Sequence, residues 1–257
     1  MLGRFQYNKT VFFGDVFDDI VYPDPIFQKL NDEYPLNSLL ILPPVLPSKI
    51  ICVGLNYKNH AAELNMTLPA NPLLFLKPPS AALPHEGLIV YPNDSGQVDY
   101  EAELGIIIGK SGKNISEEDA FDYILGYTCF NDVTARDLQK ADGQWTRAKS
   151  FDTFAPFGPF IVTAEELEQQ NLLPDNLNIM CRVIRNQNEE IRQDSNTSEF
   201  IFSIPKLISF ISSVMTLEEG DLIATGTPAG IGSLLAGDVV EVEIEGIGVL
   251  RNTVVSA

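Results

Sequence analysis

The chain has 257 residues, which is enough to bury a full hydrophobic core in one large domain, with or without a small appendage. Its formal net charge is −18, and its 17 lysine and arginine residues are spread along the chain, which excludes nucleic acid and anionic membranes as expected partners. No apolar run reaches the roughly 18 residues of a membrane span, and the first residues lack the apolar core of a signal peptide, so we expect a cytoplasmic protein.

The first 46 residues alternate short strand-like and helical pieces, such as residues 10–13 and 27–30. They run into a proline-rich segment, residues 43–47, whose stiffness is typical of a linker. We therefore expect a small N-terminal domain of residues 1–46 and a main domain of residues 47–257.

The main domain is rich in strand candidates. Short apolar or alternating runs predict strands at residues 50–53, 73–76, 88–91, 98–108, 123–130, 160–163, 177–184, 222–224, 239–244 and 248–254. Helical patterning is confined to residues 117–121 after a Ser116 N-cap, residues 134–139 and residues 204–214. Because strands and helices do not alternate regularly and no repeat is visible, the pattern predicts a mixed β fold with few helices, of the α+β class.

Cysteines and histidines give no sign of a zinc site. Cys52, Cys129 and Cys181 lie far apart in apolar runs, which predicts buried reduced thiols. The two histidines, His60 and His85, have no cysteine or histidine partner at ligand spacing. We therefore expect no bound zinc.

His60 and Glu63 lie in a polar segment just after the first strand of the main domain. On a short helix, residues three apart share a face, so the two side chains would touch. A histidine held by a carboxylate is a common general base near neutral pH. The alternative is a surface histidine beside a glutamate. For a pair of this kind without further evidence, we favour this alternative.

Glu101 and Glu103 lie in the strand candidate at residues 98–108. Alternate residues of a strand point to the same face, so their carboxylates would lie side by side, although alternating glutamates are also typical of a solvated sheet face. Asp132 favours a metal site, because it follows the next apolar strand and supplies a third oxygen ligand. Three close carboxylates favour a hard divalent ion, namely Mg²⁺ or Mn²⁺, with Ca²⁺ as a further option.

Two basic residues follow these carboxylates along the chain. Near a metal site, Lys149 would supply positive charge for an anionic substrate, and the planar fork of Arg136 suits a substrate carboxylate. The alternatives are a solvent-exposed lysine and a salt bridge from Arg136 to Asp132 or Asp137. Residues 225–232 form either an ordinary turn or one that offers free backbone N–H groups and two hydroxyls.

Several stretches of the main domain follow one another in a familiar order: residues 53–57, His60 with Glu63, and residues 74–78, 99–104, 131–139, 148–152, 202–205 and 219–228. Together they resemble the short branch of the fumarylacetoacetate hydrolase superfamily, which includes acylpyruvases, oxaloacetate decarboxylases or tautomerases, and 5-carboxymethyl-2-hydroxymuconate isomerases. The resemblance covers roughly residues 48–255. It implies a fumarylacetoacetate hydrolase-like β-roll as the catalytic domain, residues 47–257, and a homodimer.

The resemblance also implies three groups of site residues. The metal ligands would be Glu101, Glu103 and Asp132. The catalytic residues would be His60 and Glu63, as a dyad on a mobile lid, and Lys149. The substrate contacts would be Arg136, Gln139 and Thr227. Longer fumarylacetoacetases carry an aspartate ligand seven residues before the lid histidine, where this chain has Val53, so fumarylacetoacetate itself is not the expected substrate.

The expected reaction is hydrolysis of a C–C bond in a 2,4-dioxo acid, of the acylpyruvate or fumarylpyruvate type, through a metal-stabilised enolate. His60, oriented by Glu63, would take a proton from the attacking water, while Lys149 and Arg136 hold the anion. The same enolate serves oxaloacetate decarboxylation or tautomerisation and hydroxymuconate isomerisation, which stay open as alternatives. A metal-binding module without catalysis is the competing class, and the dyad and Lys149 disfavour it.

The sequence does not fix the acyl group of the substrate. We expect the cavity walls that select it to come from Leu64, Met66, Gln144, Trp145 and residues 154–157.

Overall fold

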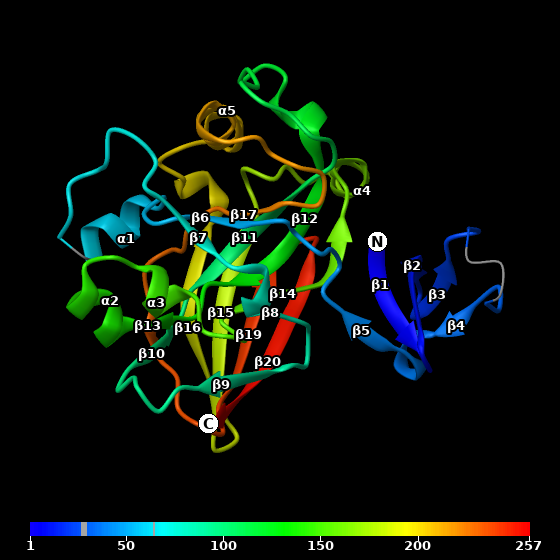
Figure 1. The fold of residues 1–257 in the computed structure, drawn as a ribbon, viewed down its shortest axis with the longest axis horizontal. Coiled ribbons are helices and arrows are strands. Elements are labelled where there is room, and N and C mark those ends of the chain that lie inside the picture. The colour runs from blue at the N-terminus through cyan, green and yellow to red at the C-terminus, as the bar shows by residue number, and fades with distance from the viewer. Residues whose placement is uncertain (27–29, 64) are drawn as a thin grey trace.

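The computed structural model describes residues 1–26, 30–63 and 65–257 of the chain (Figure 1). The helical piece predicted at residues 27–30 falls mainly outside these residues. Most of the regular structure is strand and the helices are few and short, which confirms the predicted mixed β fold of the α+β class. No helix of the described residues combines the length and the apolar character that crossing a membrane requires.

The elements follow one another along the chain. The strands are β1 (Leu2–Tyr7), β2 (Thr10–Phe17), β3 (Ile20–Pro23), β4 (Tyr34–Pro35), β5 (Leu40–Leu42), β6 (Ile50–Val53), β7 (Leu74–Lys77), β8 (Ala82–Leu83), β9 (Leu88–Tyr91), β10 (Val98–Tyr100), β11 (Ala102–Ile108), β12 (Ile124–Asn131), β13 (Thr134–Ala135), β14 (Ala155–Val162), β15 (Asn178–Arg185), β16 (Asn188–Asn196), β17 (Leu222–Ala224), β18 (Gly232–Ser233), β19 (Val239–Ile244) and β20 (Gly248–Ser256). The α-helices are α1 (Lys58–Glu63), α2 (Arg136–Asp142), α3 (Thr146–Lys149), α4 (Ala164–Gln169) and α5 (Ile204–Val214). Short 3-10 helices lie at Leu36–Ser38, Pro79–Ala81, Ala120–Tyr123 and Thr197–Glu199.

The largest sheet has the strand order β4-β3-β2-β1-β14-β12-β11-β17-β6-β7, with β5 paired to β1 and β8 paired to β14. Its central strands β11 and β12 are antiparallel, and every residue of β11 is buried. Strands buried on both faces read as continuous apolar runs, as residues 104–108 of β11 do. The carboxylates at the start of β11 and after the end of β12 are therefore held by the most deeply buried part of the sheet.

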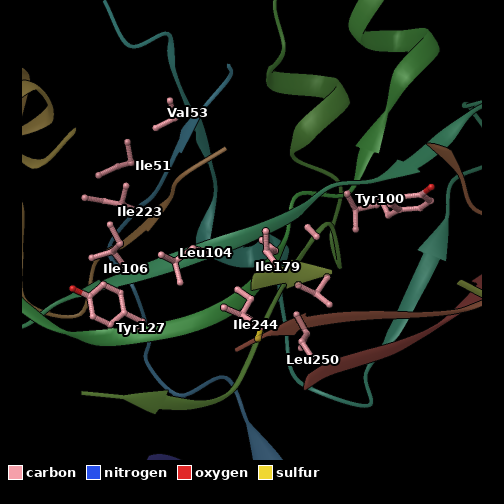
Figure 2. Packing of buried hydrophobic residues seen from close by; sticks show 14 of the residues in the cluster. Ile51, Val53, Tyr100, Leu104, Ile106, Tyr127, Ile179, Ile223, Ile244 and Leu250 are labelled. Atoms are coloured by element: carbon pink, nitrogen blue, oxygen red, sulfur yellow. The ribbon is translucent and has the colours of Figure 1, made fainter. Parts of the chain in front are cut away.

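A second sheet, with the order β16-β15-β19-β20-β9, packs against this one. Figure 2 shows Leu104 and Ile106 of the large sheet near Ile179, Ile244 and Leu250 of the second sheet. All five side chains are at most 1% exposed. Because burial of one such aliphatic side chain stabilises the fold by about 1.5–3 kcal/mol, this layer fixes the position of β11.

The N-terminal strands β1–β5 form one end of the large sheet, and they lie to one side of the other strands in Figure 1. Phe5, Phe12 and Tyr34 are buried in a separate hydrophobic cluster, and Phe160 of β14 joins it. β1 also pairs with β14 through Leu2 and Ile161. The division into a small domain of residues 1–46 and a larger domain of residues 47–257 stays a prediction.

Every strand predicted in the main domain overlaps an observed strand, but the run at residues 98–108 divides into β10 and β11 at Glu101. β16 was not predicted, because its residues are mostly polar and exposed and it is recognisable only as the partner of β15. The helix predicted at residues 117–121 is wrong: a 3-10 helix forms at Ala120–Tyr123 instead. The predicted cap, Ser116, bonds to Asp119 and closes a turn.

Two predicted helices are confirmed with small shifts at their ends. The pattern at residues 134–139 becomes α2, which begins at Arg136. α5 matches the prediction, because Ser203 caps its first turn through the Lys206 N–H and Leu207 lies in the buried stripe of the helix. The three cysteines are buried free thiols, as expected.

Candidate active site

Three carboxylates converge at the junction of β10, β11 and β12. Ligand oxygens of Glu101, Glu103 and Asp132 all lie within 4.8 Å of one another, and the three residues are 6%, 1% and 1% exposed. Glu103 belongs to β11, whereas Glu101 lies between β10 and β11 and Asp132 follows β12. The predicted convergence is therefore present, although the two glutamates do not share one continuous strand.

The backbone around Glu101 explains this convergence. Glu101 lies outside the strand ladders. Its N–H donates to Asn131 Oδ1 at 3.0 Å, and its carbonyl accepts from the Asp132 N–H at 2.9 Å. In the adjacent ladder, Ala102 pairs with Asn131. The register of β11 and β12 thus places Glu101 directly beside Asp132.

Glu103 has the least compensated charge of the three. Its Oε2 accepts from the backbone N–H of Gly226 at 2.8 Å. Gly226 has a φ of +95°, which favours glycine and which turns its N–H towards the carboxylate. Burial raises the pKa of Glu103 well above its usual range, and the nearby charges of Asp132 and Glu101 raise it further.

Lys149 and Arg136 neutralise the other two carboxylates. The Lys149 ammonium donates to Glu101 Oε2 at 2.9 Å and to Asp132 Oδ2 at 2.6 Å, while the Arg136 guanidinium bonds both Glu101 and Asp99. Burial opposes ionisation of Glu101, but these two cations outweigh it and hold its pKa well below its usual range. Burial likewise opposes the charge of Lys149, yet Asp132 and Glu101 raise its pKa.

Lys77 is a further residue of the site that the sequence analysis missed. Its side chain is fully buried, and its ammonium donates to three backbone carbonyls, those of Val133 at 2.9 Å, Lys149 at 2.8 Å and Phe154 at 2.7 Å. It also lies 2.6 Å from Asp132 Oδ1, as an ion-pair contact, since its donors are directed at the carbonyls. A lysine at the end of an apolar strand does not indicate a site residue in the sequence, and its position beside Pro78 is the one feature that distinguishes Lys77.

The donor set fits a hard divalent ion. Four buried carboxylates, those of Asp99, Glu101, Glu103 and Asp132, face only three cations, those of Lys77, Arg136 and Lys149. The three clustered ligand groups are all carboxylates, whose oxygens Mg²⁺ and Mn²⁺ prefer and which disfavour zinc. The raised pKa of Glu103 marks a carboxylate whose charge lacks a full counter-charge, as expected of a cation ligand.

His60 and Glu63 form the predicted pair on α1. His60 Nδ1 lies 2.8 Å from Glu63 Oε2; His60 is only 4% exposed, whereas Glu63 is exposed, so the histidine of the pair is buried and its carboxylate partner lies at the surface. Glu63 also accepts from the backbone N–H of Gly230 through Oε1 at 3.0 Å, which ties α1 to the turn before β18. A neutral His60 that donates from Nδ1 to Glu63 keeps its Nε2 as the basic nitrogen.

One cavity of about 410 Å³ brings these groups together. The described residues that line it are Gly54, Leu55, His60, Met66, Leu73, Gln97, Asp99, Glu101, Arg136, Gln139, Lys140, Trp145, Lys149, Ile231 and Gly232. Gln139 is placed by Arg136, which donates to its Oε1 at 2.6 Å. His60, Arg136, Gln139 and Lys149 therefore face the same space as Glu101, whereas Glu103 and Asp132 do not line it.

Thr227 does not line this cavity. Its hydroxyl donates to the Ala102 carbonyl at 2.9 Å and accepts from Gln193 Nε2 at 2.8 Å. Gln193 also accepts from the Ala102 N–H at 2.9 Å, so the two side chains fasten the start of β11. Here Thr227 supports the carboxylate strand, and its predicted substrate contact is untested.

The predicted cavity walls are found in part. Met66 and Trp145 line the cavity, and Gln144 lines the groove next to it. Residues 154–157 do not line it, so that expectation is wrong; Phe154 and Phe157 belong to the hydrophobic core clusters instead. Leu64 lies outside the described residues.

The sequence model for the C-terminal part of fumarylacetoacetate (FAA) hydrolase matches residues 49–255. A mitochondrial oxaloacetate tautomerase of Xenopus laevis is 44% identical over 228 residues, which are 85% of this chain and 69% of the relative. The solved structure of a 5-carboxymethyl-2-hydroxymuconate delta-isomerase from Mycobacterium smegmatis is 41% identical, with a TM-score of 0.88 over 100% of this chain and 98% of its own. A maleylpyruvate hydrolase from Sphingobium sp. SYK-6, solved with manganese(II) ion and pyruvate, is 30% identical, with a TM-score of 0.83 over 100% and 99%.

Proposed function

The chain belongs to the fumarylacetoacetate hydrolase family, and we propose that it is a divalent-metal-dependent enzyme that acts on a small 2-oxo acid. The first candidate reaction is hydrolysis of the C–C bond of a 2,4-dioxo acid, of the acylpyruvate or fumarylpyruvate type. One observation carries this proposal: a buried His60, held by Glu63, shares a cavity with Glu101, Arg136 and Lys149. A metal-binding module without catalysis would need none of these additional groups.

The charges of the site favour an anionic substrate. With Glu103 ionised, the four carboxylates and three cations named above sum to −1, and a divalent ion brings this sum to +1. A bound Mg²⁺ or Mn²⁺ would be held by Glu101, Glu103 and Asp132 and would supply Lewis-acid polarisation of the 2-oxo acid. Arg136 and Lys149 would add hydrogen-bond donors for the substrate carboxylate.

In the hydrolytic reaction, His60 Nε2 accepts a proton from the water that attacks the distal ketone carbon. The bond between that carbon and its neighbour on the pyruvate side then breaks. Its electron pair stays on the pyruvate fragment, which takes up a proton, and the acyl fragment leaves as a carboxylic acid. Glu63 holds the imidazole in the tautomer that keeps Nε2 basic and stabilises its charged form after the proton transfer.

The second candidate is keto–enol tautomerisation or decarboxylation of oxaloacetate. The Xenopus laevis oxaloacetate tautomerase, which is 44% identical, supports this candidate, as the maleylpyruvate hydrolase, which is 30% identical, supports the hydrolase. Isomerisation of a hydroxymuconate-type acid is supported in the same way by the Mycobacterium smegmatis isomerase. Tautomerisation and isomerisation begin with proton transfer at the carbon beside the polarised ketone, whereas decarboxylation first loses CO₂ and the resulting enolate then takes up a proton. His60 and Lys149 are placed for these proton transfers.

The decisive experiment assays chelator-treated protein, reloaded with Mg²⁺ or Mn²⁺, on acetylpyruvate and on oxaloacetate in parallel. Metal-dependent pyruvate release from acetylpyruvate, lowered about 10²–10⁴-fold by His60→Ala, is the result expected for the hydrolase. The matched control is His85→Ala, which removes the other histidine, lies outside the cavity and leaves the rate unchanged. Metal-dependent loss of the oxaloacetate enol without acetylpyruvate cleavage would replace the hydrolase by the tautomerase, and silence on both would overturn the two candidates.

We also propose that the protein is a homodimer, because oligomers are common in its family. Sedimentation velocity at micromolar concentration tests this assembly, and a single species with the mass of one chain would contradict it. The cytoplasmic location stays a prediction from the sequence.

A further inference from the structure

Trp145, the one tryptophan of the chain, lies between two hollows of the surface. One is the cavity of about 410 Å³ that holds His60, and the other is a groove of about 840 Å³ along the edge strand β7. Among the described residues, Leu73 and Trp145 are the two that line both. These two side chains therefore form the wall that separates the cavity from the groove.

The indole ring is held in place from two sides. A Cβ atom built on Gly54 would lie 2.6 Å from the ring, so the ring packs directly on the backbone of Gly54. The ring also meets Phe75 edge-on, with centroids 5.3 Å apart and an interplanar angle of 72°. These two contacts restrict the indole ring and give it a defined place in the wall.

The same residue is tied to the reacting groups. The Trp145 carbonyl accepts from the Lys149 N–H at 3.0 Å across the single turn of α3. The backbones of Trp145 and Lys149 are thus fixed relative to each other, while Glu101 and Asp132 hold the Lys149 ammonium. A substrate bound at Lys149 and Arg136 can therefore extend only over the distance between these residues and the wall.

The lining of the cavity has two chemical parts. Arg136, Gln139, Lys149 and the carboxylates suit the 2-oxo acid group. The apolar side chains of Leu55, Met66, Leu73, Trp145 and Ile231 remain for the rest of the substrate. Apolar walls favour the binding of an apolar distal group by about 0.8 kcal/mol of free energy for each buried CH₂.

We propose that Trp145, with Leu73, limits the length of the distal group of the substrate, so that the enzyme prefers short acyl chains. The inference rests on the proposed action on a 2-oxo acid and adds the part of the substrate that the wall selects. Removing the indole joins the cavity to the groove and gives longer acyl chains a place to bind.

The kinetic test measures kcat/KM for acetylpyruvate, butyrylpyruvate and hexanoylpyruvate with Mg²⁺. We expect Trp145→Ala to raise the ratio of hexanoylpyruvate to acetylpyruvate at least about tenfold, which one or two newly buried methylene groups can supply. Trp145→Phe keeps most of the wall and the wild-type order. Leu73→Ala opens the same wall at a residue that is 46% exposed, so its folding is not at risk, and Leu76→Ala, which lines the groove alone, is its control.

A binding test separates this inference from the proposed reaction. Trp145 is the sole source of tryptophan fluorescence, so its emission reports on ligands that reach the wall. In the Mg²⁺-loaded protein, 2-oxohexanoate should shift the emission, whereas pyruvate, which is too short, should bind without shifting it. If no acylpyruvate is cleaved but pyruvate and 2-oxohexanoate still differ in this way, the role of the wall is supported and the hydrolase reaction is overturned. An identical response to both acids, with an unchanged chain-length order in Trp145→Ala and Leu73→Ala, would overturn the inference.

Discussion

The ammonium group of Lys77 donates a hydrogen bond to the backbone carbonyl of Lys149 at 2.8 Å, inside the protein and directly behind the carboxylate cluster. Lys77→Met keeps the approximate length of the side chain but leaves three buried carbonyls without their donor and Asp132 without this ion-pair partner. We expect unfolding to become easier by about 3–5 kcal/mol, the range for removing one partner of a buried ion pair. Urea unfolding measures the change. Lys206→Met, which breaks an exposed pair with Glu117, should change stability by less than about 1 kcal/mol, and equal effects of the two variants would contradict the role of Lys77.

Glu103→Gln should separate metal binding from folding. Because the pKa of Glu103 is raised in the folded chain, the metal-free protein is more stable where this group is protonated and loses that stability as the pH rises through the folded pKa. A neutral amide removes this loss, so the metal-free variant should be at least as stable as the wild type at neutral pH. Its stabilisation by Mg²⁺ should disappear. Glu101→Gln is the contrast, since it weakens the pairs with Lys149 and Arg136, and it should destabilise the metal-free protein.

Metal binding should release a proton. Glu103 must be ionised to act as a ligand, and its raised pKa means that the metal-free site retains a proton above the usual carboxylate range. We therefore expect affinity for Mg²⁺ to rise with pH, by up to about tenfold per pH unit, until the pKa of Glu103 is passed. Calorimetry in buffers of different ionisation enthalpy counts the proton. A pH-independent affinity with no proton release would be incompatible with this description of the site.

His85 should make folding sensitive to mild acid, far from the cavity. Burial lowers the pKa of His85 below 6.5, and its Nδ1 accepts from the Arg251 N–H at 3.1 Å, a bond that protonation of Nδ1 would break. Its contribution to stability is therefore complete above the unfolded pKa of about 6.5 and is lost as the pH falls from that value through the lower folded pKa, by at most about 1.4 kcal/mol per pH unit. His85→Asn retains an acceptor and does not titrate. Urea unfolding at about pH 5 and about pH 8 should show a smaller difference for this variant than for the wild type.

Glu63→Gln should lower kcat with little effect on stability. The amide oxygen can still accept from the Gly230 N–H, but the amide nitrogen then faces His60 Nδ1 and favours the tautomer with its proton on Nε2. That tautomer cannot take a proton from water, so we expect a fall of about tenfold or more in kcat for acetylpyruvate or oxaloacetate. Glu117→Gln, at an exposed surface pair, is the control. An unchanged kcat in Glu63→Gln would remove Glu63 from the mechanism.

The sequence predicts most strands of the main domain because their residues are apolar runs or clear alternations. It could not predict the break at Glu101, since the residues on either side continue the same pattern. The break is set by pairing with different partners, which are β13 and β18 for β10, and β12 and β17 for β11. β16 is missed for the opposite reason: its polar residues carry no strand signal of their own. Tertiary pairing decides both cases.

For the site, the charged residues named from the sequence do meet around one cavity, and what the sequence lacks is their support. Lys77 reads as a solvent-exposed lysine, because only the fold brings three carbonyls to its ammonium. The role of Asp99 likewise cannot be predicted from the sequence, because it depends on the hydrogen bond that Arg136 donates to it at 2.8 Å. Trp145 was named as a wall residue, but its position between two hollows depends on packing against Gly54.

Glu101 is the single residue between β10 and β11, and so it joins the three-stranded sheet to the large sheet. Any rotation of one sheet against the other changes the backbone torsions of Glu101 and moves its carboxylate. An ion held by that carboxylate would resist the rotation and damp the relative motion of the two sheets. Amide hydrogen exchange in β13 and β18 should then slow when Mg²⁺ is added, although none of the three metal ligands belongs to those strands.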